Sequence, residues 1–222
     1  MKKEEIQNGQ STGKNSFMIR LFFLFIFILF LSGALSIPFY FETMTLWYKV
    51  GIDKTMLRAG QLAGMSALVM FFVQIICAVR GQYLEKHFGR SAMTGFHRIN
   101  GRVILFLAIS HVLLVLAPEG ITNLPIGKKY WPEMIGAVLL LITAVIVIST
   151  HFRQQLGITY NLWRRAHKTL GYFVLILLLA HVVFVSDSFE HSQLRAVLIL
   201  LFGVLSLWVI TAKILQYFDK GH

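Results

Sequence analysis

Six apolar stretches, each close to the length that crosses a bilayer, dominate the chain. A transmembrane helix needs about 20 consecutive, predominantly apolar residues. The stretches that we expect to cross the membrane cover residues 17–39, 58–79, 97–117, 134–150, 167–185 and 194–215. Pro118 ends the third of them, and Trp131 and Pro132 introduce the fourth, so these boundaries have local causes. The sequence therefore predicts an all-α integral membrane protein, with a six-helix bundle over residues 17–216.

The composition leaves no room for a sizeable soluble domain. Of the 222 residues, 56% are hydrophobic and only 14% are charged, far from the balance of a soluble protein. The single Cys77 excludes an intramolecular disulfide and any iron–sulfur or zinc site built from cysteines. The net charge of +11 is compatible with nucleic-acid binding, but the basic residues lie in short segments between apolar stretches instead of forming one surface. We therefore expect membrane lipid, and no nucleic acid, around this chain.

The positions of the basic residues predict the orientation in the membrane. Of the 21 lysines and arginines, 15 lie on the side that holds both termini. The others are Lys49, Lys54, Arg58, Lys128, Lys129 and Arg195. By the positive-inside rule both termini are cytoplasmic, with residues 1–16 as a short mobile tail and 217–222 as a short C-terminus of a multi-pass protein of the plasma or inner membrane. A secretory signal is the alternative for the first stretch, which is longer than the roughly 7 to 15 residues of a signal core.

Two segments carry the same pattern: a histidine, three residues, a glycine, nine residues and a second histidine. They are His97–Gly101–His111 and His167–Gly171–His181. Fourteen residues of helix turn through about 1400°, so the two histidines of each segment share a face within about 40° and stand about 21 Å apart. That distance is a large part of the roughly 30 Å hydrocarbon thickness. Each helix can therefore offer one imidazole near either side of the membrane.

Topology pairs these histidines across two helices. The helices over 97–117 and 167–185 both run from inside to outside, so His97 faces His167 near the cytoplasmic face. His111 then faces His181 nearer the outer face. Each pair is the axial ligand set of a six-coordinate b-type haem. One histidine taken alone fits a hydrogen bond to a neighbouring helix equally well, but four in a repeated frame predict two stacked haem b groups.

Further residues are candidates for contacts with these cofactors. Gly101 and Gly171 lie one turn past the inner histidines and would let a flat macrocycle approach the backbone. Arg58, on the outer side, would hold a propionate, attract an anionic substrate or only snorkel. Phe173 lies between the two haem levels, where it would bridge them or pack as any apolar residue does. Basic residues at the inner depth would compensate haem propionates or only follow the positive-inside rule; they are Arg98, Arg153, Arg164, Arg165 and Lys168.

With these residues the chain resembles the ferric reductase-like transmembrane domain shared by ferric reductases and NADPH oxidases. The resemblance covers about residues 58–215 and rests on His97-Arg98-Ile99-Asn100-Gly101 with His111, and on Leu162-Trp163-Arg164-Arg165-Ala166-His167 with His181. It implies a six-helix bundle, two haems held by the four histidines, and electron transfer from the cytoplasmic side to ferric iron or oxygen outside. It also implies that Phe173 stands where family members can carry an aromatic residue between the haems. Because bis-histidine iron has no open position, the acceptor would be reduced at the outer haem edge.

Two departures from the complete family members limit this resemblance. Such members carry a C-terminal flavin and NAD(P)H module, and this sequence has no Gly-x-Gly-x-x-Gly fingerprint. We therefore expect FAD and NAD(P)H only through a flavoprotein partner or a missing C-terminal domain, with quinol as the other donor. In addition, the oxygen-reducing oxidases are expected to place a second histidine one turn beyond the outer ligand, where this chain has Val115.

Two alternative functions stay open from the sequence. The nearest is a quinol-linked haem subunit that delivers electrons to a periplasmic methionine sulfoxide reductase, although the members compared lack an inner histidine equivalent to His97. A haem-free transporter or membrane scaffold is the alternative from another class. The absence of acidic residues from the apolar stretches disfavours it.

Overall fold

The computed structural model describes residues 2–79, 82–120, 123–185 and 187–218, and this part of the chain holds helices and no strand. Its six long helices are α1 (Lys2–Tyr40), α3 (Gly51–Val79), α5 (Arg90–Leu116), α6 (Trp131–His151), α7 (Tyr160–Val185) and α8 (Ser192–Phe218). Each contains a stretch that is long and apolar enough to cross a membrane. The predicted six-helix, all-α membrane fold is therefore confirmed.

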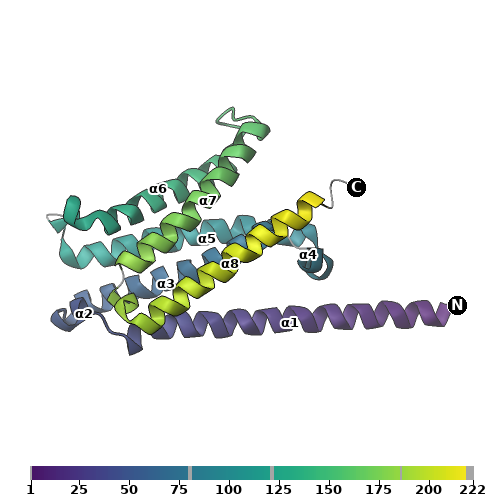
Figure 1. Cartoon of the computed structure of the whole chain (residues 1–222), viewed down its shortest axis with the longest axis horizontal. Helices are drawn as coiled ribbons and strands as arrows, with labels where there is room; N and C mark the ends of the chain where they lie inside the picture. The colour runs from purple at the N-terminus through teal and green to yellow at the C-terminus, as the bar shows by residue number, and fades with distance from the viewer. Residues whose placement is uncertain (1, 80–81, 121–122, 186, 219–222) are drawn as a thin grey trace.

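Short helices connect these six. They are α2 (Met44–Tyr48), α4 (Gln82–Phe88) and the 3-10 helices η1 (Ala117–Glu119), η3 (Lys128–Tyr130) and η4 (Asp187–Glu190). Figure 1 shows the start of α1, the end of α8, α4 and the α6–α7 loop at one end of the bundle, with α2 at the other end. We call the end near both termini the inner end, and the opposite end the outer end.

Three helices each begin seven residues before the predicted membrane span. The starts of α3, α5 and α7 lie at residues 51, 90 and 160, against predicted starts at 58, 97 and 167. The added turns are polar, so hydropathy alone does not reveal them, but their backbone hydrogen bonds simply continue the helix. Consequently His97 and His167 lie about two turns inside their helices rather than at the first residue.

The long helices pack most closely as two pairs, and α5 also contacts α6. α3 packs along α5, α6 packs along α7, and α1 and α8 both contact α3. Over the described residues, α5 and α7 are not packed along each other. Side chains, rather than closely packed backbones, therefore bridge the space between the two helices that carry the predicted ligands.

The apolar core lies mainly between α3, α7 and α8. Phe72 of α3 meets Phe202 of α8 edge to face at 4.9 Å between ring centroids, and Leu178 of α7 belongs to the same buried cluster. On the outside of the bundle large apolar side chains are exposed, such as Phe22 and Phe25 of α1. An apolar outer surface of this kind suits the hydrocarbon of a bilayer rather than water.

The structure tests only part of what the sequence predicts for the two ends of the chain. The helix α1 begins at Lys2 and so includes most of the polar segment 1–16, whose mobility and cytoplasmic location stay predictions. Near the inner end this helix is tied to α4, because Ser16 Oγ and Arg20 Nε both donate to the carbonyl of His87, at 3.1 and 2.9 Å. Of the expected C-terminal segment, residues 219–222 lie outside the described residues.

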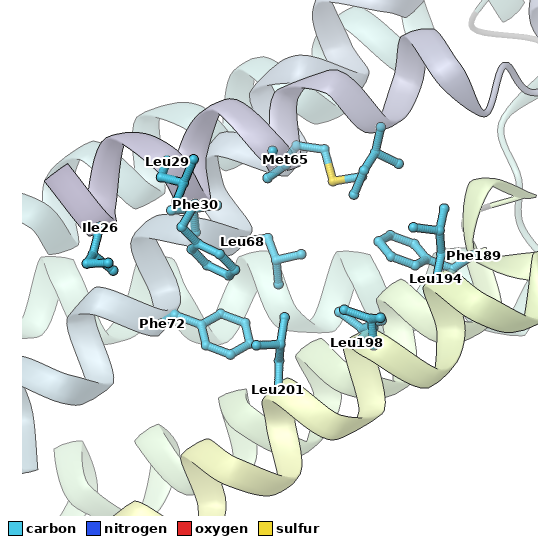
Figure 2. Close-up of a pocket in the computed structure, with 15 residues that line it drawn as sticks. Ile26, Leu29, Phe30, Met65, Leu68, Phe72, Phe189, Leu194, Leu198 and Leu201 are labelled. Carbon is cyan, nitrogen blue, oxygen red and sulfur yellow. The ribbon is translucent and has the colours of Figure 1, made fainter.

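An apolar cavity of about 390 Å³ lies between α1, α3 and α8. Figure 2 shows side chains from all three helices directed into it, among them Phe30, Phe72 and Leu201. The residues that line it carry no polar side chain and include none of the predicted ligands. The candidate site must therefore be sought between α5 and α7.

Candidate functional site

The inner pair, His97 of α5 and His167 of α7, meets across the space between the two helices. Their ring centroids are 6.2 Å apart, and the ring planes are inclined by 62°. A bond from a metal to an imidazole nitrogen is about 2 Å long, and that nitrogen lies about 1 Å from the ring centre, so two imidazoles on one metal ion have centres about 6 Å apart. The structure thus brings these histidines together at the separation that a shared metal ion requires.

A buried ring nitrogen of the inner pair has no protein partner. Within the described part of the chain, His167 Nδ1 is buried and neither accepts nor donates a hydrogen bond. An unpaired polar atom inside a membrane protein is costly, because neither water nor lipid satisfies it. His167 therefore has the free bonding capacity of a ligand.

An amide network from α3 holds the other inner histidine. Gln74 Nε2 donates to the carbonyl oxygen of His97 at 3.0 Å and lies 3.3 Å from His97 Nε2. Asn100, only 2% exposed, donates to Gln74 Oε1 at 2.8 Å and to the carbonyl of Met70 at 3.0 Å. Sequence reasoning missed Gln74, although an amide within an otherwise apolar span was a visible signal.

An indole contacts His167 from within its own helix. The centroid of the Trp163 ring lies 5.2 Å from that of His167, with the planes inclined by 37°. Trp163 Nε1 donates across to Thr150 Oγ1 of α6 at 3.2 Å. Sequence reasoning named Trp163 only as part of a motif and did not single out Thr150, because nothing in the sequence shows that α6 lies beside this tryptophan.

The outer pair, His111 of α5 and His181 of α7, is held by main-chain carbonyls. His111 Nδ1 lies 2.8 Å from the carbonyl oxygen of Gly60 on α3, and His181 Nδ1 lies 3.2 Å from that of Pro132 on α6. A carbonyl only accepts, so each Nδ1 must carry the proton. In both neutral imidazoles Nε2 is then left as the lone-pair nitrogen, the form that binds metals.

Glycines on the neighbouring helices let the outer histidines approach so closely. A Cβ added at Gly64 of α3 would lie 2.8 Å from His111 Nδ1, and one added at Gly136 of α6 would lie 2.8 Å from His181 Nδ1. A Cβ added at Gly60, one turn before Gly64, would likewise lie 2.8 Å from Val115 Cγ2. Sequence reasoning missed these three glycines, although Gly60 and Gly64 form the small-x-x-x-small spacing of close membrane helix pairs.

The two glycines singled out from the sequence differ in their surroundings. A Cβ at Gly171 would meet nothing within 4 Å, so this position faces open space. A Cβ at Gly101 would lie 3.3 Å from Gln74 Nε2, so the space beside it already holds that amide. The expectation that both glycines admit a macrocycle stays a prediction, and only Gly171 has the open surroundings that it needs.

Arg58 is engaged at the outer end of α3 by the last residues of α1 and by Glu42 just after that helix. Its guanidinium donates to the carbonyl of Pro38 and to Glu42 Oε1, the latter at 2.5 Å, and lies over the ring of Phe39 at 4.7 Å. Lys54 Nζ approaches the same Glu42 oxygen at 3.5 Å. The charge of Arg58 is thus balanced within the protein, and its role toward an anionic substrate or a propionate stays a prediction.

The remaining candidates lie on the surface of α5 and α7. Arg98, Arg164 and Arg165 are exposed, and their roles toward haem propionates or a partner stay predictions. Phe173 is also exposed, at 54%, so the described residues do not bury it between the histidine levels. At the outer level Val115 packs against Gly60, so a second outer histidine at this position would meet α3 instead of free space.

Comparison with known proteins places the chain in a family. A family model described as "Ferric reductase like transmembrane component" matches residues 63–178, slightly more than half of the chain. The match extends from α3 into α7 and includes His97, His111 and His167, while His181 lies three residues beyond its end. No curated protein and no solved structure gave a significant match. The chain belongs to the family of ferric reductase-like transmembrane components, and it is a multi-pass membrane protein of the kind that carries electrons.

Proposed function

We propose that this protein is a transmembrane di-haem b-type cytochrome, which passes electrons from a donor on the cytoplasmic side to an acceptor outside, such as ferric iron or oxygen. The observation that carries the proposal is the inner pair, whose rings stand 6.2 Å apart on two helices that are not packed along each other. Membership of the ferric reductase-like family supports the same conclusion.

The donor set fits two haem groups better than a metal ion bound by the protein alone. Within the described residues, no three histidine, cysteine or acidic side chains gather around one point. A haem would need only two ligands from the protein, and a pair of facing imidazoles would supply them. His97 and His167 would hold the inner haem, and His111 and His181 the outer one. When bound, haem supplies one-electron chemistry at its iron.

The chain's own residues would orient the histidine ligands and set the direction of electron transfer. The carbonyls of Gly60 and Pro132 keep the proton on Nδ1 of the outer histidines, so that Nε2 is the ligand nitrogen. With two histidines as ligands of each haem, the protein would leave no iron position for the acceptor to bind. The exposed arginines at the inner end would attract an acidic donor protein or compensate propionates.

The donor in this proposal is a cytoplasmic flavoprotein reductase or quinol. FAD and NAD(P)H would then act through a partner or another domain, because the sequence contains no dinucleotide fingerprint. NAD(P)H alone should not reduce the haems of the purified chain. Fast reduction without an added partner would show that this part of the proposal is wrong.

The test is a haem count on the full chain, purified from cells supplied with ample haem. We expect a low-spin b-type spectrum and about two haems per chain. His97→Ala and His111→Ala should each lower that count to about one. His191→Ala is the matched control, because His191 is exposed and its ring contacts Phe41 at 5.0 Å rather than another ligand. A preparation without a Soret band would overturn the proposal.

A further inference from the structure

The four histidine rings are not held in the same way. Three of them lie within 3.3 Å of an amide nitrogen or a carbonyl oxygen on a neighbouring helix: His97 at Gln74, His111 at Gly60 and His181 at Pro132. Within the described residues the His167 ring has no such contact with an amide or a carbonyl of a neighbouring helix, and its buried Nδ1 has no hydrogen-bond partner. What contacts its ring instead is the indole of Trp163, with centroids 5.2 Å apart.

Trp163 is itself fixed from another helix. Its Nε1 donates to Thr150 Oγ1 of α6 at 3.2 Å, while that hydroxyl donates its own proton to the carbonyl of Ile146 at 2.6 Å. Because the Thr150 hydroxyl donates its proton to a carbonyl of its own helix, its oxygen acts as the acceptor for the indole N–H. The bond therefore defines the position of the indole ring, as a buried indole N–H generally does when it finds a partner.

Because the indole is held in place, its contact with the imidazole of His167 also restricts the orientation of that ring. Trp163 precedes His167 by one helical turn, so both side chains lie on the same face of α7. The two ring planes are inclined by only 37°, closer to an offset stack than to an edge contact. Rotation of the His167 ring about its Cβ–Cγ bond would drive it against the indole. Thr150 on α6 thus restricts an imidazole on α7 through an aromatic side chain.

We propose that Trp163, anchored by Thr150, is the positioning residue of the inner ligand His167, and that it sets the ring orientation and so the spectrum and potential of the inner haem. This inference rests on the proposed function. It gives His167 the restraint that a hydrogen bond gives each of the other three histidines. Residues that orient a metal ligand in this way act on the metal without touching it.

The experiment uses the full purified chain and reads the inner haem by electron paramagnetic resonance and redox titration, assigning as inner the signal that His97→Ala removes. Thr150→Val should keep about two haems but shift the largest g value and the midpoint potential of the inner haem only. Thr150→Ser keeps the hydroxyl and should restore both. Trp163→Leu should shift the same signal and weaken inner haem binding about tenfold, as loss of an outer-shell partner commonly does, whereas Trp163→Phe should retain most of that binding.

Trp131→Leu is the matched control at the outer end of the same two helices. Trp131 of α6 contacts Phe184 of α7 at 5.1 Å, so its loss removes an equivalent aromatic contact far from the inner pair. Unchanged inner signals in both Thr150→Val and Trp163→Leu would overturn the inference while leaving the two haems in place. If Trp163→Leu does not accumulate, Thr150→Val alone decides. A wild-type chain without haem would refute the proposed function and this inference together.

Discussion

A single methyl group at Gly136 should weaken binding of the outer haem and spare the inner one. A Cβ at this position would lie 2.8 Å from His181 Nδ1 and nearer still to Cε1, closer than Cβ atoms approach other atoms in real proteins. The obstacle is the imidazole ring rather than the end of a flexible chain, so Gly136→Ala must displace His181 or push α6 from α7. Either movement also stretches the 3.2 Å contact between His181 Nδ1 and the carbonyl of Pro132.

The size of the effect follows from three contributions. Overpacking costs about 1–3 kcal/mol, and loss of one hydrogen bond costs about 1 kcal/mol. Alanine is favoured over glycine within a helix by about 1 kcal/mol, which offsets the second cost. The net of about 1–3 kcal/mol corresponds to outer haem binding that is about 5- to 150-fold weaker, at about 1.4 kcal/mol per factor of ten.

The assay is haem content and haem dissociation of the purified variant, with the outer signal identified by His111→Ala. Gly203→Ala is the matched control, because a Cβ at this α8 position meets nothing within 4 Å. It should keep both haems and leave dissociation unchanged. If Gly136→Ala binds the outer haem as tightly as the control does, the close contact drawn here between α6 and His181 is wrong.

The other predictions concern the inner pair, the direction of flow and the topology. Gln74→Leu removes the amide that holds His97, at 3.0 Å from its carbonyl, and should weaken inner haem binding about 10- to 100-fold without changing the outer signal, as measured by haem dissociation. In vesicles, His111→Ala should let a donor on the inner side reduce the inner haem but stop reduction of an external acceptor. His97→Ala should instead block reduction of the inner haem itself. If both variants turn over as fast as wild type, the assigned order is wrong. With Cys77 replaced by Ser, a cysteine placed at the exposed Lys128 should react with an impermeant thiol reagent added outside, and one at the exposed Gln155 should not.

The six spans could be predicted because an apolar stretch of about 20 residues has few other structures open to it. The helix ends could not, since the polar first turns of α5, from Arg90 onward, continue the hydrogen-bonding pattern without any hydropathy signal. A hydrophobicity pattern records where lipid surrounds the chain. It carries no information on how far a helix extends into water.

The histidines themselves were predictable because their repeated spacing is local to one helix. What holds them was not, because Gln74, Gly136 and Thr150 lie on helices that only the fold brings beside α5 and α7. Arg58 is a second case in which the sequence does not reveal a partner that the fold brings close. Its sequence position suggested a free outer cation, but the carboxylate of Glu42 reaches it once α1 and α3 are packed.

The outer histidines donate to main-chain oxygens, and this affects how the protein can diverge. No substitution at residue 60 or 132 deletes a carbonyl, so mutation cannot easily retune that restraint except by moving a whole helix. Gln74 and Trp163 act through side chains, and a single codon change replaces either of them. Under the proposed function, related chains could therefore adapt the inner, electron-receiving end to new donors by point mutation, while the outer, electron-releasing end would be inherited with the backbone.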